Sequence, residues 1–235
     1  MNVKLSLFAS RHHKNKLLRL LIKPLWNKYV RYNKNCSIRN LHQNGAEALH
    51  ILHQAFSEAG ITYWLEFGTL LGAIREHDFI PTDDDIDIGV FYSDCKKVQE
   101  TLLKAGFRLK REIRVEDGTK GFEQTYMFRK IPIDIFFNHK TESDELFFHS
   151  FSFINDGKHP KNACIVEKIT IPFTGVMEYP FKNKVLSVPT DYKAHLLAHY
   201  GPDYMIPDPT FDYTQVAKNI HYYPITERVG IYRQF

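Results

Sequence analysis

The chain has 235 residues, of which 43% are hydrophobic, and this is enough to build the core of one sizeable domain. Its three cysteines, Cys36, Cys95 and Cys164, are odd in number and form no CxxC pair. This argues against a disulfide framework or a zinc cluster and favours a reducing compartment. The net charge is +4, but ten Lys and Arg residues and no Asp or Glu precede Glu47, so the rest of the chain is slightly acidic. An anionic partner is therefore expected for the N-terminal segment alone.

Residues 1–38 are predicted to form a basic amphipathic arm, and residues 39–235 a globular domain. Between Lys16 and Trp26, apolar residues alternate with basic ones, as in helices that lie in a membrane interface. The apolar run is too short and too charged to span a bilayer, and it lacks the small-residue cleavage site of a secretory signal. Two interpretations stay open, namely binding to an anionic membrane surface and packing on the domain. Aromatic side chains that could stack on bases are sparse here, so no nucleic acid is expected as a partner.

Hydrophobic periodicity and turn residues predict helices first and then a β-rich region. In chain order we expect a helix over 40–60, a strand over 61–67, a helix over 70–76, a strand over 85–91 and a helix over 94–106. Strands follow over 107–115, 125–129, 131–137, 146–153 and 165–173, then a β region over 175–188 and a helix over 191–200. The tail, rich in Tyr and Pro, is predicted to be irregular. These elements indicate an α/β fold with a mixed sheet, in which the two strands that carry acidic residues are adjacent and helices cover one face.

Three alternate carboxylates, Asp83, Asp85 and Asp87, stand at the start of an apolar strand. Because strand side chains alternate between faces, Asp85 and Asp87 emerge on the same face. Carboxylates this close repel one another unless a cation lies between them, and ligands that are all oxygen favour Mg²⁺ or Mn²⁺. The spacing imitates an EF-hand loop, but that loop needs a Gly where Ile88 stands and a Glu where Asp94 stands. A Mg²⁺ (or Mn²⁺) site is therefore predicted here.

Asp134 is a lone charge in the apolar run 131–137 and is predicted to complete this metal site. A buried carboxylate without a partner costs several kcal/mol, so a cation is expected beside it. The alternatives are a salt bridge to Arg129 or Lys130, or exposure at a sheet edge.

Gly68 and Thr69 open a predicted helix, and the free backbone N–H groups at a helix start can hold phosphate oxygens. Arg75, two turns later, could add a charge-assisted phosphate contact. A Gly-Thr pair alone is more often only a helix start, and the chain has neither a GxxxxGK[ST] nor a GxGxxG motif. Joined to the acidic residues downstream, however, the pair indicates phosphoryl transfer.

The histidines are scattered along the chain. His195 and His199 lie one helical turn apart, but no Glu follows the first, so they do not form a metalloprotease motif. Most histidines are predicted to be ordinary surface or capping residues. The sequence does not identify a general base, although a carboxylate of the metal site could serve.

Several of these motifs together resemble the LicD/fukutin family of phosphotransferases. The resemblance is carried by FGTLLGAIR at 67–75, FIP at 79–81, DDDIDI at 83–88 and IDI at 133–135, and it extends to PTDY at 189–192 and HYGPDYM at 199–205. Asp134 stands where the third metal-binding Asp of the family is expected. Two positions depart from the family pattern: Thr82 stands where Trp is usual and Asp78 where Gly is common. Both bear on donor-headgroup specificity more than on chemistry.

The resemblance implies a nucleotidyltransferase-like fold and a LicD-like catalytic domain over residues 39–235. It implies metal-dependent transfer of phosphocholine, ribitol phosphate or glycerol phosphate from a CDP-linked donor to a hydroxyl of a cell-surface glycan, with release of CMP. The same carboxylates would also serve a nucleotidyltransferase that moves an NMP from an NTP and releases pyrophosphate, or a metal-stabilised binding module without turnover. The expected location is cytoplasmic, and peripheral on the inner face of the membrane if the arm binds lipid, where a lipid carrier could present the glycan.

Residue by residue, the resemblance implies two groups at the active site. Asp85, Asp87 and Asp134 would be catalytic and hold the metal ions, assisted by Asp83. Gly68, Thr69 and Arg75 would bind the donor phosphates.

Overall fold

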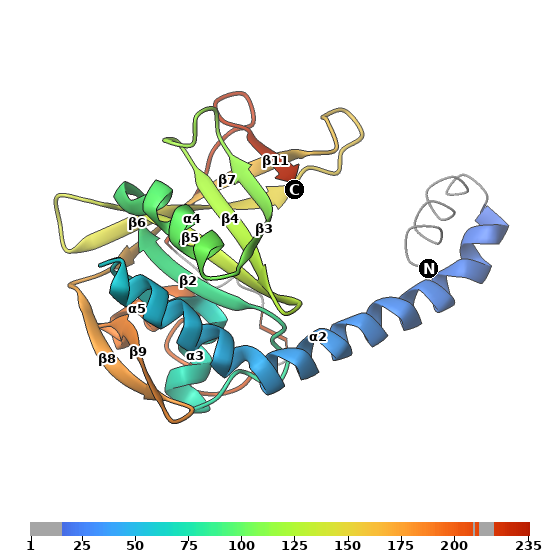
Figure 1. The fold of residues 1–235 in the computed structure, drawn as a ribbon. Coiled ribbons are helices and arrows are strands. Elements are labelled where there is room, and N and C mark those ends of the chain that lie inside the picture. The colour runs from blue at the N-terminus through green and yellow to red at the C-terminus, as the bar shows by residue number, and fades with distance from the viewer. Residues whose placement is uncertain (1–15, 209, 212–218) are drawn as a thin grey trace.

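The computed structural model describes residues 16–208, 210, 211 and 219–235, with residues 16–22 described by their backbone alone. Figure 1 shows a body of strands and helices from which one long helix extends toward the N-terminus. The helices are α2 (Lys16–Glu58), α3 (Phe67–Arg75), α4 (Cys95–Lys104), which follows the short 3-10 turn η1 (Tyr92–Asp94), and α5 (Tyr192–Tyr200). The strands are β1 (Tyr63–Leu65), β2 (Ile86–Phe91), β3 (Arg108–Arg114), β4 (Phe122–Phe128), β5 (Ile131–Lys140), β6 (Glu145–Phe153), β7 (Ala163–Pro172), β8 (Val176–Phe181), β9 (Lys184–Pro189), β10 (Ile220–Tyr222) and β11 (Gly230–Gln234).

Helix α2 is much longer than the helix predicted over 40–60, because it begins at Lys16 and runs without interruption to Glu58. Its end is as expected: Gly60 adopts a left-handed conformation (φ 60°), and the N–H of Ile61 donates to the carbonyl of Phe56 at 2.8 Å. The C-terminal half of α2 packs on the body, whereas residues 27–36 are almost entirely exposed. The predicted boundary between residues 38 and 39 therefore falls within one continuous helix, and the division into an arm and a domain stays a prediction.

The mixed sheet is confirmed. Strands pair in the order β1-β2-β5-β4-β3-β11-β7-β10, and among these pairs β2 and β5 run parallel while the others are antiparallel. Strand β6 pairs with both β5 and β7, so strands β5, β4, β3, β11, β7 and β6 close into a ring. Strands β8 and β9 form a separate hairpin. The two strands that carry acidic residues, β2 and β5, are adjacent as predicted.

The parallel pair β2–β5 separates the main core from the acidic face. Ile86 and Ile88 of β2 lie on one face with Ile133 and Ile135 of β5, and all four are fully buried in a core cluster that includes side chains of α2 and α4. Side chains of a strand alternate, so the opposite face of the same pair carries the acidic residues. The apolar packing of one face thus fixes the position of the carboxylates on the other.

The predicted irregular tail is confirmed over residues 201–208 and 223–229 but is wrong at two short strands. Strands β10 and β11 both lie there, and Ile231 of β11 pairs with Arg114 on one side and Ala163 on the other. The Tyr- and Pro-rich composition masked these short strands, because their pairing partners are distant in the sequence.

Gly89 of β2 is required by the close approach of Trp64 of β1. Trp64 is fully buried, and a methyl group on Gly89 would overlap its indole ring. We expect Gly89→Ala to lower the free energy of unfolding by about 1–3 kcal/mol, because a rigid ring in a filled core must move. Urea unfolding measures this change, and a midpoint equal to that of the parent would contradict the packing described here.

Candidate active site

Three carboxylates converge at the edge of the β2–β5 pair. Asp87 of β2 is the register partner of Asp134 of β5, and Asp85 immediately precedes β2. Each of the three offers an oxygen that lies within 4.8 Å of the oxygens offered by the other two. Asp87 and Asp134 are distant in the sequence and were each predicted as metal ligands from separate motifs, and the fold places them side by side. We call Asp85, Asp87 and Asp134 the acidic trio.

The trio carries negative charge that its surroundings do not fully compensate. Burial and the neighbouring carboxylates of Asp134, Asp84 and Asp83 raise the pKa of Asp85 to about 7. Burial, together with Asp85 and Asp134, also raises the pKa of Asp87 well above its ordinary value. Both shifts mean that the folded protein resists full ionisation of these groups, as expected of carboxylates forced together.

Asp134 has a cationic partner that the sequence analysis did not identify. Nη2 of Arg111, on β3, lies 3.3 Å and 3.4 Å from the two carboxylate oxygens of Asp134, and the hydroxyl of Thr125 donates to one of them. Among the described residues Asp134 forms no ion pair with Arg129 or Lys130, and the guanidinium of Arg129 pairs with Glu47 of α2 at 2.6 Å instead. Exposure at a sheet edge is excluded because Asp134 is buried. Arg111 and Thr125 therefore hold Asp134 in place and offset part of the charge of the trio.

Arg111 also faces a second buried carboxylate, Glu123 of β4, at 3.6 Å. Burial and the charge of Asp134 raise the pKa of Glu123 to about 8, although Arg111 acts in the opposite direction. The guanidinium of Arg111 thus forms ion pairs with both Glu123 and Asp134. Around the trio, carboxylates therefore still outnumber the cationic side chains that contact them. No motif signalled Arg111 or Glu123, because each stands in a strand with no distinctive local pattern.

Asp83 lies beside the trio and against the first turn of α3. A methyl group on Gly68 would come within 2.5 Å of a carboxylate oxygen of Asp83 and 3.7 Å of one of Asp87. The missing side chain of Gly68 is what allows the helix start to approach the acidic residues. Burial and Asp84 raise the pKa of Asp83, and the cations Lys34 of α2 and Arg75 of α3 partly oppose this shift.

Thr69 and Arg75 lie near the site, but their side chains make protein contacts. Helix α3 begins at Phe67, so Gly68 and Thr69 belong to its first turn. The Thr69 hydroxyl is buried and accepts a hydrogen bond from the backbone N–H of Asp87 at 2.9 Å. The Arg75 guanidinium donates to Glu76 at 2.7 Å and to the carbonyl of Tyr204 at 3.1 Å. Their predicted roles in phosphate binding stay predictions.

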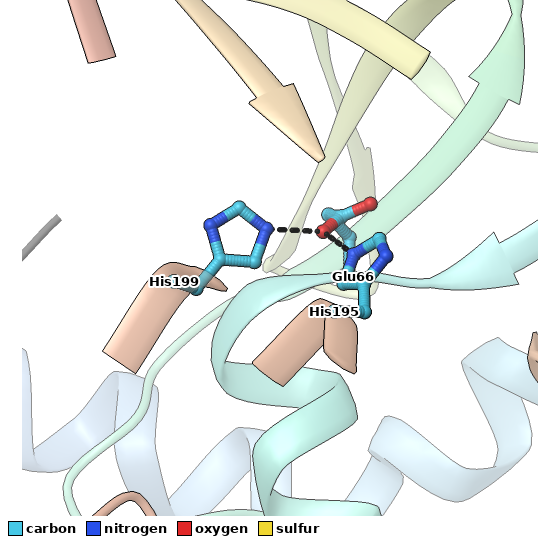
Figure 2. A group of neighbouring side chains, drawn as sticks. All are labelled: Glu66, His195 and His199. Carbon is cyan, nitrogen blue, oxygen red and sulfur yellow. Dashed lines mark hydrogen bonds and ion pairs between the residues drawn. The ribbon is translucent and has the colours of Figure 1, made fainter. Parts of the chain in front are cut away.

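A second polar cluster, Glu66 with His195 and His199, lies at the N-terminal end of α3 (Figure 2). All three side chains are fully buried, so the prediction that most histidines are surface or capping residues is wrong for this pair. One oxygen of Glu66 accepts from Nε2 of His195 at 2.7 Å and from Nε2 of His199 at 3.0 Å. The signals in the sequence were a charged Glu within an apolar run and the one-turn spacing of the histidines.

The carboxylate of Glu66 is hydrogen-bonded by ring N–H groups of the two histidines in its own cluster. His195 faces the Pro172 carbonyl with Nδ1 at 3.2 Å, so both of its ring nitrogens donate and the ring is cationic. Burial lowers the pKa of His195, but the charge and hydrogen bond of Glu66 outweigh this and raise it, whereas burial prevails at His199 and lowers its pKa. Burial alone would raise the pKa of Glu66, yet both histidines hold it well below its usual range. Its potential ligand atoms lie within 4.8 Å of one another, but they meet at hydrogen-bond distances and form a neutralised cluster.

The acidic trio has the opposite character and suits a hard divalent cation. Its potential metal-ligand atoms are all carboxylate oxygens and lie close together. The carboxylates carry more negative charge than the guanidinium of Arg111 offsets. Mg²⁺ and Mn²⁺ prefer such ligands. Asp85, Asp87 and Asp134 are therefore the residues that could hold a metal ion, with Asp83 adjacent.

A family model described as "LicD/FKTN/FKRP, nucleotidyltransferase domain" matches residues 60–191, which contain the whole trio and α3. The chain belongs to this family. Among curated proteins, the LicD-family chain is 27% identical over 195 residues to a ribitol-5-phosphate transferase, FKTN, of Macaca fascicularis, covering 79% of this chain and 39% of the relative. It is 26% identical over 184 residues to the human ribitol 5-phosphate transferase FKRP, covering 73% of this chain and 33% of the relative.

A bacterial relative is an uncharacterised protein of Rickettsia prowazekii (strain Madrid E), 32% identical over 151 residues and matched over 64% of this chain and 46% of the relative. The LicD-family chain thus spans less than half the length of these curated relatives. Among solved structures, the lincomycin-bound lincosamide adenylyltransferase LnuA matches 62% of this chain and 80% of that chain, with 17% identity and a TM-score of 0.39. A score this low carries no argument about the fold.

One departure from the family pattern has a structural role. The carboxylate of Asp78, in the loop between α3 and β2, receives the Lys182 ammonium at 2.6 Å and lies 4.0 Å from His42. Lys182 belongs to the turn of the β8–β9 hairpin, and His42 belongs to α2. Asp78 therefore connects the loop that leads to the acidic trio with two separate elements.

Within residues 16–208, 210, 211 and 219–235, no helix combines the length and the apolar character needed to cross a bilayer.

The charge of the trio predicts an unusual effect of Asp85→Asn on the metal-free protein. The pKa of Asp85 rises from its ordinary 3.8 to about 7 in the folded state, so folding stability is lost as the pH rises toward 7 and the loss is complete above it. At pH 8 we expect Asp85→Asn to raise the free energy of unfolding by about 1–3 kcal/mol, measured by urea unfolding in EDTA. Lowering the pH from 8 toward 5 should raise the free energy of unfolding of the parent. The same change of pH should raise that of Asp85→Asn by less.

The matched control is Asp144→Asn, which removes one carboxylate from an exposed loop. Its stability should equal that of the parent, since surface substitutions of this kind have small effects. Mg²⁺ or Mn²⁺ should then raise the melting temperature of the parent and the control, but not that of Asp85→Asn. Equal stabilities of all three proteins in EDTA would show that repulsion within the trio is negligible.

Proposed function

We propose that this LicD-family protein is a metal-dependent phosphotransferase that moves a phospho-alcohol from a CDP-linked donor to a hydroxyl of a glycan and releases CMP. The observation that carries the proposal is the acidic trio beside the first turn of α3, on a mixed sheet. Acidic oxygens that could hold divalent cations and a helix start that could hold phosphate are the two elements that phosphoryl transfer requires. That the relatives FKTN and FKRP are named ribitol-5-phosphate and ribitol 5-phosphate transferases supports a phospho-alcohol as the transferred group.

In the proposed reaction, a hydroxyl oxygen of the acceptor attacks the phosphorus that bears the alcohol. The bond from that phosphorus to the oxygen of CMP breaks, CMP leaves with the electron pair, and the hydroxyl proton passes to a carboxylate of the trio. Asp85, Asp87 and Asp134, with Asp83 adjacent, would hold Mg²⁺ or Mn²⁺, and the bound ion would supply positive charge to the diphosphate and to the leaving CMP.

The start of α3 would position the donor. Backbone N–H groups of Gly68 and Thr69 point along the helix axis toward its N-terminus, where the helix dipole favours a phosphate. The Thr69 hydroxyl is already bound to Asp87, so its contribution would come from the backbone. Arg75 lies close enough to affect the pKa of Asp83, and its charge would favour the approach of an anionic donor.

The proposal predicts selective, metal-dependent stabilisation by one donor. Melting temperature is measured in Mg²⁺ with CDP-choline, CDP-ribitol, CDP-glycerol, CTP, ATP and UTP. A ligand at 100 times its dissociation constant stabilises a protein by about 2.7 kcal/mol, so one CDP-alcohol should give a clear shift that is absent in EDTA and in Asp85→Asn. With that donor and its acceptor, Asp85→Asn should lower turnover by at least ~10²-fold.

The identity of the released product separates this function from the main alternative. Release of CMP supports the phosphotransferase. A shift with an NTP alone, followed by release of pyrophosphate, would instead show a nucleotidyltransferase. Tight binding of a donor by the parent without turnover in the presence of acceptor would indicate a binding module.

We also propose that the exposed part of α2 binds an anionic membrane surface and thereby brings the site to a lipid-linked glycan. Lys23, Lys28, Arg31 and Lys34 are exposed along this part of the helix, and so are Leu25 and Tyr32, at 67% and 66% of their surface. Basic and apolar side chains together are typical of helices that bind membrane interfaces. Lys34 also lies near enough to Asp83 to lower its pKa, so the basic surface continues to the edge of the site.

Reversing four of these charges tests the membrane proposal. We expect the fourfold Lys/Arg→Glu variant at 23, 28, 31 and 34 to lose at least ~90% of its sedimentation with vesicles that contain phosphatidylglycerol, since each basic residue near such a surface contributes about 1 kcal/mol. The control reverses Lys104, Lys158, Lys161 and Lys184, which are exposed elsewhere. Equal sedimentation of the two variants would favour a helix that does not bind membranes.

A further inference from the structure

We propose that Glu66, His195 and His199 form a positioning clamp that fixes the backbone of Asp87 and thereby holds the acidic trio in its binding geometry. The clamp touches neither the acidic oxygens nor the expected substrate, so its members are positioning residues. That the positioned group binds a metal rests on the proposed function, whereas the mechanical role of the clamp does not.

Both backbone hydrogen-bonding groups of Asp87 are held by the start of α3. The carbonyl of Asp87 accepts from the N–H of Glu66 at 3.0 Å, and the N–H of Asp87 donates to the hydroxyl of Thr69 at 2.9 Å. Glu66 is also the N-cap residue of α3, because its carbonyl accepts the first helical bond from Leu70 at 2.9 Å. A shift of Glu66 would therefore move the first turn of α3 and Asp87 together.

The side chain of Glu66 is fixed by three donors from two elements. Its Oε1 receives His195 and His199 of α5, and its Oε2 receives the indole N–H of Trp64 of β1 at 2.7 Å. His195 in turn is held by the carbonyl of Pro172, the last residue of β7. Glu66 is fully buried, so a carboxylate with three donors in fixed directions has little freedom to move. Figure 2 shows how both rings approach the carboxylate from α5.

The trio needs such support because its members repel one another. Asp87 lies at the start of β2, one residue after the strand begins, where the sheet restrains the backbone least. Asp134 is held by Arg111 and Thr125, but no ion pair of Asp87 occurs among the described residues. The bonds to Glu66 and Thr69 therefore add to the β2–β5 pairing and restrain the backbone of Asp87 beside Asp134.

Two substitutions of His199 separate positioning from general stability. In His199→Gln, the amide N–H can take the place of the ring Nε2 and donate to Glu66, whereas His199→Leu fills the space without a donor. Glu66 keeps its cationic partner His195 in both variants, so both should fold. Val98→Ala, in the buried core at α4, serves as a control that lowers stability away from α3.

The readouts are hydrogen exchange of the Asp87 amide and the affinity for Mn²⁺ measured by electron paramagnetic resonance. With His199→Leu we expect the Asp87 amide to exchange about tenfold faster and Mn²⁺ to bind about tenfold more weakly, because a hydrogen bond to a buried charge is lost. His199→Gln should restore both quantities to within about threefold of the parent. Val98→Ala should leave Mn²⁺ affinity unchanged at temperatures where it is folded.

Unchanged exchange at Asp87 in His199→Leu would overturn the clamp. So would equal effects of His199→Leu and His199→Gln, or a profile of His199→Leu that matches Val98→Ala. A parent protein that binds no Mn²⁺ would contradict the proposed function instead, and the exchange of the Asp87 amide would still decide whether the clamp holds this residue.

Discussion

Mutual repulsion between Asp87 and Asp134 is the constraint on which the rest of the site depends. The parallel pairing of β2 and β5 places these carboxylates side by side, and the apolar packing of the opposite face prevents either strand from slipping. Arg111 and Thr125 hold one member of the pair, while the start of α3 holds the other. The surrounding elements therefore act together to keep like charges close, an arrangement whose electrostatic cost a bound cation would offset.

The two buried acidic clusters of this protein solve the same electrostatic problem in different ways. At Glu66, cationic His195 and neutral His199 supply the protons that the carboxylate needs, and the cluster is complete within the chain. Among the described residues, the three carboxylates of the trio have one cationic side chain in ion-pair contact, the shared guanidinium of Arg111, so the cluster could accept a cation from solution. Their proximity across the first turn of α3 lets the complete cluster support the incomplete one.

The part of the site that local patterns encode could be predicted from the sequence. The alternating carboxylates at the start of an apolar strand and the lone charge of Asp134 indicated a shared position, and the adjacent acidic strands confirm it. Arg111 could not be found in this way, because its proximity to Asp134 depends on the β3–β4–β5 register. The bond from Glu66 to His195 likewise joins segments that only the tertiary fold brings together. For the same reason β11 was missed, since a short strand takes its identity from partners rather than from its own residues.

The ring of strands also sets an order of events during synthesis. Residues 230–234 of β11 fill the gap between β3 and β7, so both of these strands leave the ribosome long before their shared neighbour exists. Pairing across such sequence distances forms slowly, and strand edges that wait for a partner are prone to intermolecular association. The nascent chain therefore passes through a stage in which the acidic pair of strands has emerged while the sheet is still open.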